Sequence, residues 1–149
     1  MQIQTPAKLQ PVYAIDPTKI EWYKGFRRPI VDILADLSKP IPPRYLATRK
    51  QGGTILTYLP WQTCCKLLDR CAPGWDYSVS NITTTSDRIF VTVKLTIRAE
   101  EGDISRDASG TEMLNCGSYG DPSSNAESMA LRRAAAKYGL ARYLYEKDA

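Results

Sequence analysis

Basic side chains gather on two elements that the sequence predicts near the end of the chain. One side of the strand pattern RIFVTVKLTIRA carries three cations: Arg88, Lys94 and Arg98. The helical pattern SNAESMALRRAAAKYGLARYLY, in which Glu127 is the one acid, carries four more: Arg132, Arg133, Lys137 and Arg142. Such side chains bind phosphate groups without reading a base sequence. Two basic stripes with so little acidic compensation favour a polyanionic partner over two ordinary solvated faces.

Side chains for enzymatic chemistry are scarce in this sequence. The chain has no histidine and therefore lacks the most common general base. Its four cysteines form no CxxC pair, which argues against a zinc site, and it has no GxxxxGKS or GxxxxGKT phosphate loop. We therefore expect a binding protein without a cofactor. The enzymatic alternative is a metal-dependent nuclease, whose ligands would be four acids in a weak strand and loop: Asp103, Asp107, Glu112 and Asp121.

The composition predicts one soluble globular domain. The 149 residues are 43% hydrophobic and 24% charged, and their formal net charge is +4. Such a mild basic balance has to be interpreted from where the charges lie. No apolar run approaches the roughly 20 residues that span a bilayer. The opening segment MQIQTPAKLQ also lacks the apolar core of a signal peptide. We expect a cytoplasmic, nucleoid-associated location and no membrane contact.

The hydrophobic patterns predict an α+β fold. Residues 1–28 contain three prolines and are expected to form an irregular arm, followed by one domain over residues 29–149. The fold class is an antiparallel β-meander, a β-β-β-α core, packed against helices. The expected elements, in order, are a helix at 29–37, a strand at 54–59, a helix at 61–71, strands at 75–85, 88–99 and 102–114, and a helix at 124–145.

Residue spacing indicates which side of each element is apolar. The central strand should turn five alternating residues toward the core: Ile89, Val91, Val93, Leu95 and Ile97. The helix at 61–71 carries apolar residues at helical spacing: Trp61, Cys64, Cys65, Leu68 and Cys71. The buried side of the last helix should consist of Ala130, Leu131, Ala134, Tyr138, Ala141 and Tyr145. Its run of three alanines, 134–136, would let another backbone approach closely.

An ordered set of short motifs resembles the annealing domain of the Rad52 family of single-strand annealing proteins. The set comprises RYLATRKQGG, the Tyr58 strand with its following helix, Gly74-Trp75, the RIFV start of the central strand, and LRRA followed by Tyr138-Gly139. The resemblance covers roughly residues 30–145. The terminal AAAKYGLARYLY looks closest to bacterial relatives of the DdrA type, which are associated with DNA repair.

The resemblance implies an ATP-independent protein that forms rings or helical filaments and binds single-stranded DNA in a basic groove. It assigns Arg49, with Lys50 beside it, to a basic position ahead of the Gly-Gly turn, and Arg132 and Arg133 to an adjacent basic pair in the last helix. A third cation of the family falls on Ala136 here. Lys137 lies next to it, about 100° around the helix.

A second, outer DNA site, which could hold duplex DNA, is also implied. Arg88 matches its basic position at the start of the central strand, and Lys94 and Arg98 extend the same stripe. Its other basic residue, before the last helix, has no match in CGSYGDPSSN. Two further readings use similar surfaces: a protein that protects DNA 3' ends without annealing, and an RNA-binding α+β module.

Overall fold

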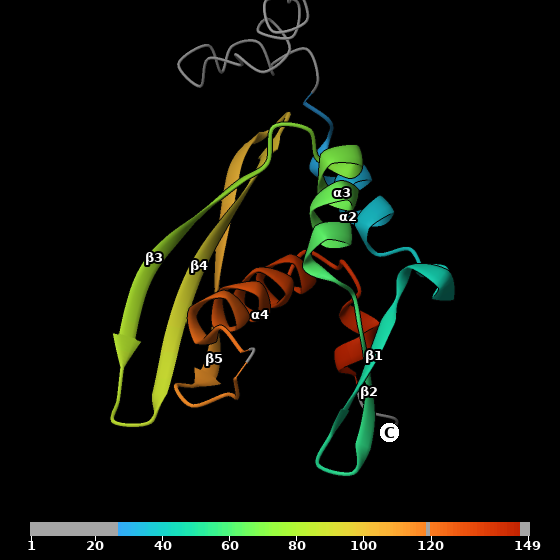
Figure 1. Ribbon diagram of the computed structural model, residues 1–149. Helices are drawn as coiled ribbons and strands as arrows, with labels where there is room; N and C mark the ends of the chain where they lie inside the picture. The colour runs from blue at the N-terminus through green and yellow to red at the C-terminus, as the bar shows by residue number, and fades with distance from the viewer. Residues whose placement is uncertain (1–26, 119, 147–149) are drawn as a thin grey trace, which may run out of the picture.

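The computed structural model describes residues 27–118 and 120–146. The arm expected over residues 1–28 lies outside this part, apart from Arg27 and Arg28, which hydrogen-bond to the folded domain. The elements follow in the order α2 (Ile30–Leu37), the 3-10 turn η2 (Pro43–Tyr45), β1 (Ala47–Gln51), β2 (Thr54–Tyr58), α3 (Trp61–Cys71), β3 (Asp76–Thr84), β4 (Arg88–Ala99), β5 (Gly102–Met113), α4 (Pro122–Ala136) and the 3-10 turn η3 (Arg142–Tyr145) (Figure 1).

The strands form the predicted antiparallel meander. β4 pairs with β3 on one side and with β5 on the other, and a register shift between Val79 and Asn81 bends β3. The helix α4 crosses one face of this sheet (Figure 1). The α+β fold class predicted from the sequence is confirmed. Within the described ranges, no helix is long and apolar enough to cross a membrane.

The core lies between α4 and the inner face of the sheet. The alternating side chains of β4 are buried there as the sequence predicts, with exposed fractions of 8% or less. Helix and sheet approach very closely at Gly110 of β5, where an added Cβ would lie 2.0 Å from the backbone oxygen of Ala126. The alanines of α4 and this glycine therefore act together: small residues on both sides let the helix backbone rest on the strand.

The last helix is shorter than predicted, because α4 ends at Ala136. Gly139 has φ +110°, and the amides of Gly139 and Leu140 donate to the carbonyls of Ala136 and Ala135 at 2.9 and 3.2 Å. This is a Schellman ending, in which a glycine in a left-handed conformation stops the helix. The chain then turns into η3. Tyr145, expected on the buried side, is 53% exposed.

A separate two-stranded hairpin stands opposite the main sheet (Figure 1). Its β2 is the strand predicted at 54–59, whereas its partner β1 was missed. Gly52 and Gly53, with φ +57° and +80°, form the two-residue turn between them. The register places Arg49 of β1 opposite Leu56 of β2. The hairpin thus presents a basic residue on a thin, two-sided ribbon.

Candidate nucleic-acid interface

Tyr58 brings together cations from two distant parts of the chain. The guanidinium carbon of Arg49 in β1 lies 5.5 Å from the centre of the Tyr58 ring, and that of Arg132 in α4 lies 5.4 Å from it. Together the two distances place these carbons at most about 11 Å apart, their sum. The electron-rich face of the ring attracts both cations. A tyrosine on β2 therefore joins the hairpin to the helix at a doubly charged point.

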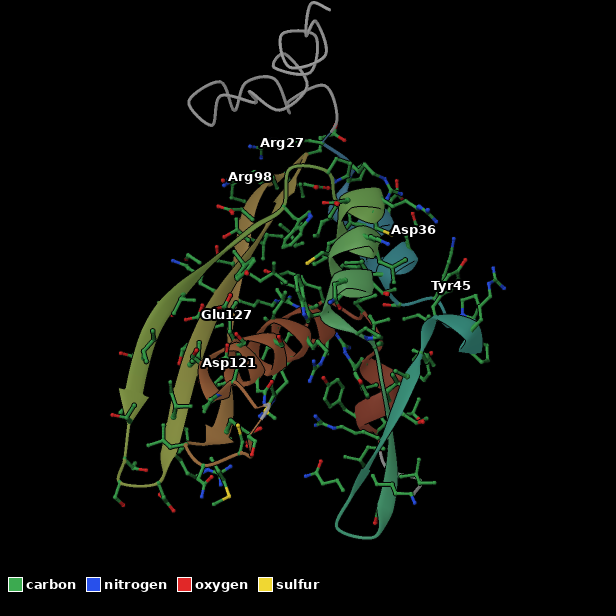
Figure 2. The ribbon with its side chains drawn as sticks, in the orientation of Figure 1. Arg27, Asp36, Tyr45, Arg98, Asp121 and Glu127 are labelled. Atoms are coloured by element: carbon green, nitrogen blue, oxygen red, sulfur yellow. The ribbon has the colours of Figure 1, made fainter. Side chains whose placement is uncertain are left out.

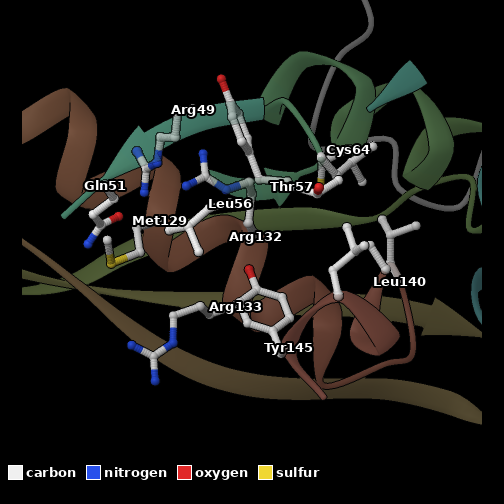
Figure 3. A pocket seen from close by; sticks show the side chains of 14 residues that line it. Arg49, Gln51, Leu56, Thr57, Cys64, Met129, Arg132, Arg133, Leu140 and Tyr145 are labelled. Carbon is white, nitrogen blue, oxygen red and sulfur yellow. The ribbon is translucent and has the colours of Figure 1, made fainter. Parts of the chain in front are cut away.

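This point borders a cleft of about 370 Å³ between the hairpin, α4 and η3, named here the inner cleft (Figure 3). Arg49, Arg132 and Arg133 lie around it, as Figure 3 shows. Its remaining wall is largely apolar: Leu56, Leu59, Cys64, Met129, Leu140, Ala141 and Leu144. Burial raises the pKa of the Cys64 thiol to about 12, so this wall stays neutral at physiological pH. The inner cleft therefore has basic side chains at its edge and an apolar wall.

A second, wider depression of about 770 Å³ continues from the same residues and is named here the open groove. It shares Arg49, Tyr58 and Arg132 with the inner cleft. It adds Lys50 from the hairpin and Arg88 from the start of β4. The structure thus brings Arg88 into one continuous basic path with the hairpin and helix residues.

The stripe predicted along β4 divides in the structure. At about 3.4 Å per residue, Arg98 lies about 34 Å along the strand from Arg88. Arg98 is ion-paired with Asp103 at 2.7 Å and with Asp76 at 3.8 Å, close to Arg27 at the same end of the sheet (Figure 2). Lys94 is exposed on the outer face of the sheet, opposite Asp107 of β5. Only Arg88 of the three borders the open groove.

Lys137 occupies a different position from the groove arginines. Its ammonium donates to the backbone carbonyl of Asp107, and its own carbonyl accepts from Arg106 and Arg142 at the end of α4. It lines a side hollow of about 350 Å³ together with Arg133 and Tyr145. Arg133 and Tyr145 line both the side hollow and the inner cleft, and so connect Lys137 to that cleft.

The cations of the groove lack acidic partners. Among residues 27–118 and 120–146, no ion pair within 4.0 Å involves any of these cations: Arg49, Lys50, Arg88, Arg132, Arg133 and Lys137. Arg28, Lys39 and Arg98, in contrast, are all paired. Cations held together without local neutralisation repel one another and attract an anion. The arrangement suits a chain of phosphates.

The four acids of the nuclease alternative lie at different places: Glu112 lines the open groove, and Asp107 lies opposite Lys94 in the sheet. Asp103 forms ion pairs with Arg27 and Arg98. The Asp121 carboxylate caps α4 and accepts a hydrogen bond from the Ser124 amide at 3.4 Å. Hydrogen bonds from the two serines that follow it lower the pKa of Asp121 further. No three metal-ligating side chains gather within the part of the chain that the structure describes.

Two aromatic side chains near the groove were not expected there. Trp61, which the helical spacing grouped with buried cysteines, is 44% exposed and lines the open groove. Tyr145 lines the inner cleft and the side hollow beside Arg133. Tyr145 is 53% exposed, yet partial desolvation of its hydroxyl by the walls of the cleft raises its pKa, while the charges of Arg132 and Arg133 oppose that rise. One feature of the sequence could have indicated that Trp61 is exposed: it directly follows Pro60 and is the first residue of α3.

Comparison with known proteins identifies the family. Residues 30–149 match the family model described as Rad52/22 family double-strand break repair protein. The chain is 35% identical over 127 residues to the Arabidopsis thaliana protein named DNA repair RAD52-like protein 1, mitochondrial, covering 84% of this chain and 72% of the relative. It is 30% identical over 139 residues to DNA repair RAD52-like protein 2, chloroplastic, of the same plant, covering 91% and 70%. The chain therefore belongs to the Rad52/22 family.

Proposed function

We propose that the protein binds and anneals single-stranded DNA without ATP, in recombinational DNA repair. The observation that carries the proposal is the joint placement of Arg49 and Arg132 over Tyr58, on a path that continues to Arg88. Two of these cations come from segments more than 80 residues apart in sequence. The fold therefore assembles them, and they make no ion pairs with the other described residues, which leaves them available to phosphates. The names of the two plant relatives support a place in DNA repair.

Annealing needs cations that hold the phosphates and bases that stay free to pair. Two complementary strands repel each other through their phosphates, and cations along one strand lower that repulsion. When phosphates face Arg49, Lys50, Arg132 and Arg133, bases that point away remain free to pair. Base pairing then supplies the free energy, so no nucleotide has to be hydrolysed. Lys137 at the side hollow would extend the same binding surface.

We further propose that the protein assembles into a ring or filament. In the part of the chain that the structure describes, β1 pairs with β2 alone, so each strand of the hairpin keeps one unpaired edge. Ile55 on β2 is 65% exposed. Free strand edges with apolar side chains invite contacts with another copy, and head-to-tail contacts close into rings or continue as filaments. Such an assembly would line up one groove after another along a strand.

Several finer assignments stay predictions. These are the closeness to bacterial DdrA-type relatives, the cytoplasmic and nucleoid-associated location, and an outer DNA site at Arg88, Lys94 and Arg98. The ion pairs of Arg98 weaken its case as a phosphate ligand. End protection without annealing and RNA binding would use the same cations, and the assays below distinguish them.

The test is annealing of two complementary oligonucleotides, one carrying a fluorophore and the other a quencher, in buffer without ATP. We expect the wild type to accelerate quenching, and Arg132→Ala to lose most of that acceleration. Arg70→Ala is the matched control, since Arg70 is exposed on α3 and lines neither the inner cleft nor the open groove. Tight binding without acceleration would favour end protection, and preferential binding of RNA of the same sequence would favour the third reading.

A further inference from the structure

Trp61 presents an aromatic ring on the wall of the open groove. It is the first residue of α3, directly after Pro60, and 44% of it is exposed. Proline at this point sets the backbone that enters the helix. The backbone that carries the indole is therefore fixed at a helix start. It borders the same groove as Arg49, Lys50 and Arg88.

Trp61 differs from Trp75 in the partners of its indole ring. The Trp75 indole donates from Nε1 to Asp69 Oδ1 at 2.7 Å and stacks on Tyr77 with ring centres 6.1 Å apart and planes 9° from parallel. Within the described residues, the Trp61 indole makes no such hydrogen bond or ring stack. A buried or interfacial tryptophan usually finds a partner for its N–H. An indole exposed beside a basic groove is instead available to a ligand.

The polar side chains beside Trp61 differ from those that hold phosphate. The uncharged hydrogen-bonding groups that line the open groove come from α3, β5 and α4: Gln62, Thr111, Ser124, Asn125 and Ser128. The acid Glu112 of β5 lies among them and accepts a hydrogen bond from Asn125 Nδ2 at 3.3 Å. Amides and hydroxyls of this kind can bond base edges as well as the backbone. The cations of the hairpin and α4 supply charge to the same groove. One groove thus combines cations, which suit the phosphate of a nucleotide, with an aromatic ring and amides, which suit its base.

We propose that Trp61 stacks on a base of the bound single strand while the neighbouring cations hold its phosphates. The inference rests on the proposed function and names a base contact within it. Stacking on an aromatic ring is tolerant of sequence, because every base has a flat face. It therefore adds affinity without adding sequence preference. It also fixes the register of the strand, with one base per protomer seated at Trp61 and the others available for pairing.

The experiment compares strands with and without bases. Trp61→Ala, Trp61→Phe and the wild type are titrated with an oligothymidylate and with an abasic deoxyribose-phosphate strand of equal length, at one salt concentration. We expect Trp61→Ala to lose about tenfold in affinity for the oligothymidylate for each protomer that the strand engages, the size of one base–aromatic stack. We expect no loss for the abasic strand, and a smaller loss for Trp61→Phe. Intrinsic fluorescence of the wild type should be quenched by the oligothymidylate, and Trp61→Phe should lose most of that quenching.

Thermal midpoint and oligomer size are measured first for each variant, and Trp75→Phe shows whether removing any tryptophan has the same effect. An equal loss on both strands would overturn the stacking inference, because it would assign Trp61 a role in placing the cations. An unchanged affinity on both strands would overturn it as well. In either case the wild type still binds both strands, so the groove proposal survives. A wild type that binds neither strand would overturn both.

Discussion

Removing Arg49 and Arg132 together should change how steeply DNA binding falls with salt. Five cations border the inner cleft and the open groove: Arg49, Lys50, Arg88, Arg132 and Arg133. If each neutralises one phosphate of a single strand, the slope of log K against log salt is about −3.5 per protomer, at about −0.7 per phosphate. Affinity then falls about 130-fold between 50 and 200 mM salt. Three remaining cations give a slope of about −2.1 and a fall of about 18-fold.

The two residues are a suitable pair because the structure bounds their separation. Guanidinium carbons at most about 11 Å apart repel by at least about 0.4 kcal/mol in water and about 1.5 kcal/mol at the effective dielectric of a protein surface. A phosphate between them relieves that repulsion. Binding of one strand therefore relieves the repulsion between both residues. Removing both should lower the slope of log K against log salt.

The assay is fluorescence anisotropy of a labelled oligothymidylate at several salt concentrations. The ratio of slopes is the quantity to compare, since it does not depend on how many protomers one strand engages. The double variant Arg49→Ala, Arg132→Ala should retain about three fifths of the wild-type slope. The control is Lys66→Ala, Arg70→Ala, which removes the same charge from the exposed side of α3. An equal drop in slope for the control would refute the groove, because net charge would then explain the effect.

Three further experiments test the packing and the groove. Gly110→Ala should lower the free energy of unfolding by about 2 kcal/mol or more in urea denaturation, because the new methyl meets the Ala126 backbone; unchanged stability would contradict the close approach. Gly139→Ala should cost about 1 kcal/mol in the same measurement, since φ +110° strains any other residue, and a neutral result would argue against the Schellman ending. Arg133→Ala should weaken strand binding more than Arg88→Ala, because Arg88 already donates to Thr111, and the reverse order would move the main contact to β4.

The meander was predictable because its central strand has an unambiguous pattern. Apolar residues alternate through residues 89–97, and an antiparallel neighbour on each side follows from short turns. The last helix was predicted too long because residues 140–145 continue the apolar pattern beyond Gly139. Periodicity alone does not show that a glycine will take the left-handed conformation. The hydrogen bonds that end α4 depend on the conformation of Gly139, which the sequence does not specify.

The missed strand β1 has a different cause. Its residues ATRKQ show no alternation of apolar and polar types, because both sides of the hairpin ribbon are largely exposed. Its strand conformation comes from pairing with β2 across the Gly52-Gly53 turn. For the same reason, the sequence did not predict that Arg49 lies near Arg132. That proximity depends on Tyr58, whose ring is placed by the fold.

The candidate site illustrates why single basic stripes are weak signals and assembled ones are stronger. Arg88, Lys94 and Arg98 look equivalent along β4, yet the structure pairs Arg98 with acids and leaves Arg88 facing the groove. A cation that a carboxylate already neutralises contributes little to the binding of a phosphate. The informative feature is therefore that cations from the hairpin, from β4 and from α4 reach one path and make no ion pairs with the described residues. Tyr58 holds two of these cations together. Among the residues that the structure describes, Glu112 is the one acid in the lining of the open groove, so most of the charge on this path is left for a strand of phosphates to neutralise.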